Sequence, residues 1–120
     1  MITDNANLIT WQKIGTNLAG SFNSNALMVQ TYSLLSISLQ WSGTFNGSFK
    51  IQVSNDSAST PTYWHDISGS TINVASGAYL GQTGFTYSIT DVSYRWIRVV
   101  YTFTSGTGTL TNCDLVMKGG

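Results

Sequence analysis

The single histidine of this sequence, His65, has the most versatile chemistry of its residues, and it lies between Trp64 and Asp66. A histidine and an aspartate act together in nucleophilic catalysis when their side chains meet. Adjacent residues of a strand point to opposite faces, so His65 and Asp66 cannot form such a relay in a regular strand. We therefore expect no catalytic residue and interpret His65 as a surface or interface residue.

The acidic residues are dispersed along the chain, at Asp4, Asp56, Asp66, Asp91 and Asp114. Sugar hydrolysis needs two carboxyl groups about 5 to 9.5 Å apart, one of them with a raised pKa, and the spacing indicates no such pair. One cysteine and one histidine are too few ligands for zinc. A calcium site formed by Asn55, Asp56 and loop carbonyl groups stays open, because calcium accepts oxygen ligands from irregular turns. Our prediction is that the protein needs no metal and no cofactor.

Aromatic residues are the remaining candidates for binding, since their rings offer flat apolar faces to a sugar. Tyr63, Trp64 and His65 are adjacent in the sequence and form the candidate ligand-binding group, with a surface glycan as the expected ligand. Aromatic residues and arginine are also favoured at protein interfaces, which makes Trp96 and Arg98 the candidate interface residues. Packing inside the fold is the alternative explanation for all of these rings.

The composition indicates a protein that works inside an assembly. Charged residues make up 8% of the chain, and five basic residues balance five acidic ones. Soluble domains usually have about 25% charged residues, and a net charge of about 2 to 8 opposes self-association. We expect a homo-oligomer, a trimer or a larger ring. The few basic residues form no stripe that could follow phosphates, so we expect no nucleic-acid partner.

Alternation of apolar and polar residues dominates the chain and predicts β-strands. It is clearest over 35–41 and 49–53, with Asn46-Gly47 between them as the turn of a predicted hairpin. A second hairpin is predicted from 95–103 and 109–117. Further short strands are expected at 63–67, 71–74 and 85–89, and no window carries a helical pattern. The sequence therefore predicts one all-β domain over residues 1–120, an antiparallel β-sandwich of the jelly-roll class with about eight strands.

Cys113 is the only cysteine, so no disulfide can form within the chain, and its alternating surroundings indicate a buried apolar residue. The N-terminal residues lack the basic and then apolar pattern of a signal peptide. No apolar run approaches the roughly 18 residues of a membrane span. We expect synthesis in the host cytoplasm without a signal peptide, and no membrane partner.

Three stretches resemble discoidin-like (coagulation factor 5/8 C-type) jelly-roll domains. They are Phe49-Lys-Ile-Gln-Val-Ser-Asn-Asp56, Trp64-His-Asp-Ile67 and Tyr94-Arg-Trp-Ile-Arg-Val-Val-Tyr101. The resemblance covers about residues 35–117, and the compact Ser/Thr/Gly-rich form looks like small virion proteins of tailed bacteriophages. It implies a jelly-roll fold and a place in a virus particle. The chain departs from the family pattern because it lacks the terminal disulfide, and no ligand is carried over.

Together these observations give a leading hypothesis and an alternative. The leading hypothesis is a non-enzymatic structural protein of a bacteriophage particle, a capsid-decoration, tail or fibre module that associates with itself and with other virion proteins. The alternative is a carbohydrate-binding module that acts as a host receptor-binding domain. Glycan affinity of the isolated protein would favour the alternative, and a stable oligomer without glycan affinity would favour the leading hypothesis.

Overall fold

The computed structural model describes residues 7–11, 14–74, 82–90 and 92–119. The described part contains nine strands and no helix, hence no helix long and apolar enough to cross a membrane. The strands are β1 (Asn7–Thr10), β2 (Thr16–Asn17), β3 (Phe22–Asn23), β4 (Leu27–Met28), β5 (Leu34–Ser54), β6 (His65–Asp66), β7 (Ile72–Asn73), β8 (Gly84–Ile89) and β9 (Trp96–Lys118). The predicted all-β, antiparallel sandwich is confirmed, and the short strands β1 to β4 were not predicted.

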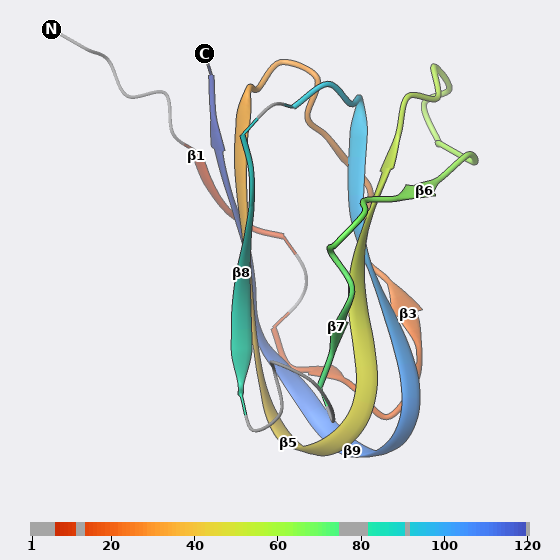
Figure 1. Ribbon diagram of the computed structural model, residues 1–120, viewed down its shortest axis with the longest axis vertical. Coiled ribbons are helices and arrows are strands. Elements are labelled where there is room, and N and C mark those ends of the chain that lie inside the picture. The colour runs from red at the N-terminus through yellow and green to blue at the C-terminus, as the bar shows by residue number, and fades with distance from the viewer. Residues whose placement is uncertain (1–6, 12–13, 75–81, 91, 120) are drawn as a thin grey trace, which may run out of the picture.

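Two long strands, β5 and β9, form the centre of the fold. They pair antiparallel with each other from Leu34↔Lys118 to Ser54↔Trp96, and both bend sharply halfway along, so the ladder folds over itself (Figure 1). One half, called layer A, adds β8, β1 and β2. The other half, called layer B, adds β3, β4, β6 and β7. The two layers of the sandwich are thus two halves of one continuous sheet.

Glycine permits the bend. Gly43 and Gly106 have φ angles of 101° and 91°, in the left-handed region that other residues rarely adopt. A Cβ atom at Gly43 would lie 2.6 Å from the carbonyl oxygen of Thr107, and one at Gly106 would lie 2.5 Å from that of Thr44. The strands therefore approach so closely at the bend that side chains have no room at these positions.

The two predicted hairpins are wrong. Segments 35–41 and 49–53 do not pair with each other; they belong to opposite layers, and each pairs with a part of β9. A two-residue type I′ turn at Asn46-Gly47 needs positive φ at both residues, and no described residue other than glycine has positive φ. The segment instead continues the ladder through a register shift between Asn46 and Gly47. In the same way 95–103 and 109–117 are two halves of β9.

The core lies between the layers, and an aromatic cluster fills it near the bend. Trp41 of layer A stacks on Phe49 of layer B with ring centroids 5.2 Å apart. Phe49 also contacts Tyr101 at 4.8 Å, and the Tyr101 hydroxyl donates a hydrogen bond of 2.8 Å to the Leu18 carbonyl oxygen. Burial raises the pKa of Tyr101. The alternation predicted the buried residues of β5 correctly: Leu35, Ile37, Leu39, Trp41, Phe49, Ile51 and Val53.

Replacing Gly43 by Ala is expected to destabilise the protein by more than about 1 kcal/mol, because the new Cβ meets backbone and the φ angle is strained. Urea unfolding followed by tryptophan fluorescence measures the change. Gly20→Ala is the control, since a Cβ there meets nothing within 4 Å. Equal stability of the two variants would show that the bend tolerates a side chain.

Candidate functional site

A pocket at the end of layer B, the loop pocket, brings together two of the three residues predicted to bind ligand. It has a volume of about 350 Å³ and is lined by Val53, Ser54, Asn55, Asp56, Tyr63, His65 and Tyr94. Tyr63 is 73% exposed, so its ring is available to a ligand. His65 is also exposed, and Tyr94 is half-buried. An exposed ring among hydroxyl, amide and imidazole groups is suited to a small polar ligand such as a sugar.

Asp56 organises the loop that carries Tyr63. Its carboxylate accepts backbone N–H bonds from Ala58 at 3.0 Å and from Thr62 at 2.9 Å, and a hydroxyl bond from Thr62 at 3.2 Å. These bonds, with the Ala58 bond contributing most, lower the pKa of Asp56. Both carboxylate oxygens therefore hold the loop, and a calcium ion would have to compete with these donors.

Trp64, the third predicted ligand-binding residue, points away from the loop pocket. Its indole N–H donates to the Pro61 carbonyl oxygen at 3.2 Å, and its ring lies under the Arg98 guanidinium, 4.2 Å from centroid to Cζ. The sequence prediction thus grouped residues that the chain divides between two surfaces. Alternation explains the division, because Trp64 and His65 are consecutive where β6 begins.

Arg98 and Trp64 belong to the outer surface of layer B, together with Gln52, Asp66 and Lys50; we call this surface the Trp64–Arg98 face. Arg98 donates from Nε to Gln52 Oε1 at 2.8 Å. Gln52 donates to Asp66 at 2.8 Å, and Lys50 forms an ion pair with Asp66 at 3.2 Å. These two donors, Gln52 first, lower the pKa of Asp66.

The two predicted interface residues differ in what remains available to a partner. The indole N–H of Trp96 already donates to the Asp56 carbonyl oxygen at 3.1 Å, and the ring is half-buried. Arg98 is also half-buried, but it is held by an amide and a ring and not by a carboxylate. Contact of either residue with another protein stays a prediction.

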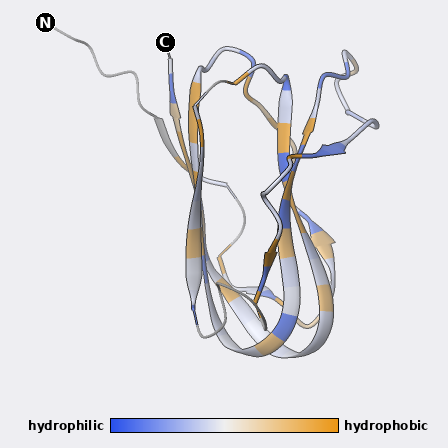
Figure 2. Cartoon of the chain, viewed as in Figure 1, coloured by the Kyte–Doolittle hydropathy of each residue, from blue (hydrophilic) through white to orange (hydrophobic). Residues whose placement is uncertain are grey.

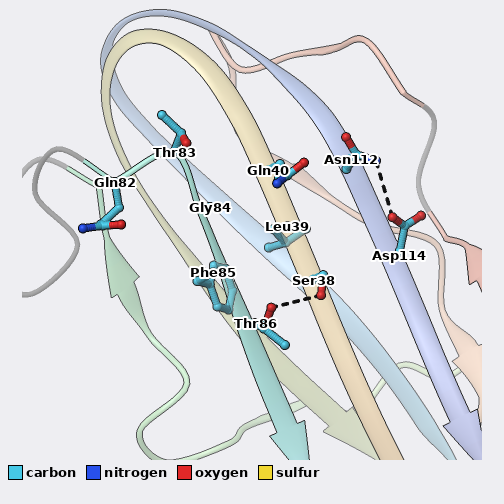
Figure 3. A pocket seen from close by; sticks show the side chains of 10 residues that line it. All are labelled: Ser38, Leu39, Gln40, Gln82, Thr83, Gly84, Phe85, Thr86, Asn112 and Asp114. Carbon is cyan, nitrogen blue, oxygen red and sulfur yellow. Dashed lines mark hydrogen bonds between the residues drawn. The ribbon is translucent and has the colours of Figure 1, made fainter.

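A second hollow, the polar groove, lies on the outer surface of layer A (Figure 3). Its volume is about 460 Å³, and β5, β8 and β9 all contribute: Ser38, Leu39, Gln40, Gln82, Thr83, Gly84, Phe85, Thr86, Asn112 and Asp114. Ser38 and Thr86 share a hydrogen bond of 3.1 Å, and Asn112 donates to Asp114 at 3.4 Å. Asp114 is the one charged residue of the ten that line the groove. The groove therefore presents uncharged hydrogen-bonding groups around a single carboxylate.

No local pattern in the sequence predicts the polar groove. Ser38, Thr86 and Asp114 are far apart in the chain and meet only because β8 and β9 pair with the same part of β5. The alternating pattern predicted that these polar positions face outward. It did not predict which strands are neighbours, and the groove depends on that pairing.

Comparisons with solved structures show what the fold is similar to. The SPBc2 prophage-derived protein YomS has a TM-score of 0.64 at 8% identity, over 99% of this chain and 97% of that protein. Chitosan-binding module 1 from the chitosanase/glucanase of Paenibacillus sp. IK-5 has a TM-score of 0.50 at 16% identity, over 98% and 95% of the two chains. Module 2 of the same enzyme, solved with chitotriose, has 0.50 at 18%, over 93% and 95%.

These likenesses concern the fold alone, because all three identities are low. No protein-family model matches the sequence, and no curated protein matches it. The β-sandwich part of the expected resemblance is therefore confirmed, and membership of the discoidin family stays a prediction.

The hydrogen bonds of Asp56 predict that the Tyr63 loop loosens in acid. Since the folded-state pKa of Asp56 lies below 3.8, its contribution is complete above that value and is lost as the pH falls through the lowered pKa. We expect the amides of Ala58 and Thr62 to exchange faster in Asp56→Ala than in the wild type, in NMR hydrogen exchange near neutral pH. Asp114→Asn is the control, a carboxylate removed outside the loop. Unchanged protection in Asp56→Ala would mean that other contacts hold the loop.

Proposed function

We propose that this protein is a non-enzymatic structural module of a bacteriophage particle, made in the host cytoplasm and incorporated through contacts with its own copies and with other virion proteins. The observation that carries the proposal is the outer surface, which the strands cover with uncharged polar residues. Only one ion pair, Lys50–Asp66, joins described residues. Most of the ribbon is pale in Figure 2, the colour of intermediate hydropathy. Such a surface repels its own copies weakly.

Two further observations support this function. The fold resembles that of a prophage-derived protein over nearly the full length of both chains. The described sites also lack the arrangement that hydrolysis requires. The loop pocket and the polar groove each contain one carboxylate, Asp56 and Asp114. His65 shares the loop pocket with Asp56, but both Asp56 oxygens accept bonds from Ala58 and Thr62, and no hydrogen bond joins Asp56 to His65 among the described residues. A relay needs a hydrogen bond between a histidine and a carboxylate, and a carboxyl pair needs two carboxylates in one site.

Sedimentation velocity of the purified protein at high micromolar concentration tests self-association. We expect a trimer or a larger ring, with nearly the same distribution in about 0.05 M and about 0.5 M salt, because few ion pairs exist for salt to screen. A monomer in both buffers would contradict the proposed assembly.

A second candidate function, carbohydrate binding at the host surface, is favoured by the exposed ring of Tyr63 beside His65 and Tyr94 in the loop pocket. The fold likeness to chitosan-binding modules supports it. Sugar rings stack on such rings while polar neighbours bond their hydroxyl groups. On this account the virion module would also recognise its host, and the two functions are compatible.

Binding of chitotriose and of neutral oligosaccharides by calorimetry, after a glycan-array survey, tests this candidate. Tyr63→Ala is expected to weaken binding about tenfold or more, because the stacking surface is lost, while Tyr63→Phe keeps most of it. Met28→Ala, which changes an exposed apolar residue that does not line the pocket, is the control. No binding by the wild type, or equal binding by Tyr63→Ala, would exclude a sugar site at Tyr63.

A further inference from the structure

Two charged side chains face outward from opposite layers of the sandwich without an oppositely charged partner among the described residues. Arg98 lies on layer B and Asp114 on layer A, and both belong to β9. The ion pair formed within the described part of the chain joins Lys50 to Asp66 and includes neither of them. A half-buried charge is stabilised when a group of opposite charge reaches it.

The guanidinium of Arg98 is held by its neighbours in an orientation suited to binding a carboxylate. Gln52 holds its Nε atom at 2.8 Å, and the Trp64 ring supports its plane at 4.2 Å. Desolvation by burial lowers its pKa, the effect expected for a cation that lacks an anion nearby. Asp66, the carboxylate on the Trp64–Arg98 face, is already bonded to Gln52 and Lys50. A planar guanidinium held in this way matches the planar geometry of a carboxylate.

Asp114 has a carboxylate that can pair with a guanidinium, and it lies in the polar groove. It is half-buried in the polar groove, and among the described residues its carboxylate accepts one side-chain hydrogen bond, the 3.4 Å contact from the Asn112 amide. Figure 3 shows Asp114 and Asn112 at one side of the groove, across from Thr86 and Gly84 on β8. Because glycine, serine and threonine line this part of the groove, a bulky group of another molecule has room to enter.

The two residues cannot meet within one copy, because the core lies between the layers. They do lie at similar heights above the bend. Taking Thr44 as the middle of the bend, Ser38, the partner of Asp114, lies six residues before it, and Gln52, the partner of Arg98, lies eight residues after it. At about 3.3 Å per residue, the heights differ by roughly 7 Å. Stacking two copies layer B to layer A, with a small shift, brings Arg98 opposite Asp114.

We propose that Arg98 of one copy pairs with Asp114 of the next copy, so that the Trp64–Arg98 face docks into the polar groove. This inference rests on the self-association put forward under the proposed function and gives it a defined interface. The contact joins two different surfaces, so it is heterologous and generates a closed ring or an open stack, depending on the rotation between copies. The partner is a second copy of this chain because the chain itself supplies both halves of the charge pair.

Charge reversal tests the interface by sedimentation velocity. Arg98→Asp and Asp114→Arg are each expected to lower the association constant about tenfold or more, because each places like charges opposite one another. The double variant Arg98→Asp/Asp114→Arg restores opposite charges and should recover much of the association that each single variant loses. Full recovery is not expected, because the Arg98→Asp substitution loses the contacts of the arginine with Gln52 and Trp64. An equimolar mixture of the two single variants should associate more strongly than either variant alone, since every contact between unlike copies is then complementary. A closed ring with an odd number of copies, such as a trimer, would keep one contact between like copies.

Arg95→Asp is the matched control, with the same change in net charge at an exposed arginine outside the Trp64–Arg98 face. It should leave assembly unchanged. Circular dichroism melting of every variant checks folding. If a reversal fails to fold, Arg98→Gln and Asp114→Asn replace it in a double-mutant cycle, where the double variant should lose no more affinity than either single variant.

The outcomes separate this inference from the proposed function. A wild type that assembles while both reversals assemble equally well overturns the Arg98–Asp114 contact and leaves the structural function standing. Folded single variants that lose assembly, with a double variant that does not regain it, also overturn the direct pair. A monomeric wild type overturns the interface and the proposed assembly together.

Discussion

The continuous pairing of β5 with β9 through the bend is the constraint on which the rest of the structure depends. Because each strand runs through both layers, one ladder fixes the register of the whole sandwich. The close approach at Gly43 and Gly106 keeps the ladder paired where it turns, and the stacking of Trp41 on Phe49 holds the layers together just above the turn. The short strands only complete the edges of layers that the two long strands already define.

The same register explains where the candidate sites lie. Alternation along β9 sends Ile97 and Leu115 into the core and their neighbours Arg98 and Asp114 outward, on opposite sides of the molecule. One strand thus supplies a cation to one outer surface and an anion to the other. In a chain with 8% charged residues, two such groups are a large share of all its charges, and the proposed contact between copies uses both. The loop pocket is independent of this arrangement, because Asp56 organises it locally.

Much of the fold could be predicted from period-two alternation, which identified the strands and the buried residues of β5. Strand pairing could not be predicted in the same way. Asn46-Gly47 is typical of a hairpin turn, yet β5 continues through this segment, paired with β9, and the two strands approach closely at Gly43 and Gly106. The sequence grouped Tyr63, Trp64 and His65 as candidate ligand-binding residues. Tyr63 and His65 do share a pocket, whereas alternation should have separated Trp64 from them, and ligand binding itself stays a prediction. The polar groove needs long-range pairing that no local pattern contains.

The most direct test of the central claim, that the folded ladder presents complementary faces to neighbouring copies, is an experimental structure of the assembled protein by crystallography or electron microscopy. We predict that layer B of one copy packs against layer A of the next. The Arg98 guanidinium should then lie within about 4 Å of the Asp114 carboxylate of the neighbouring copy. An assembly in which both side chains face solvent, or in which copies meet through the same layer, would contradict it.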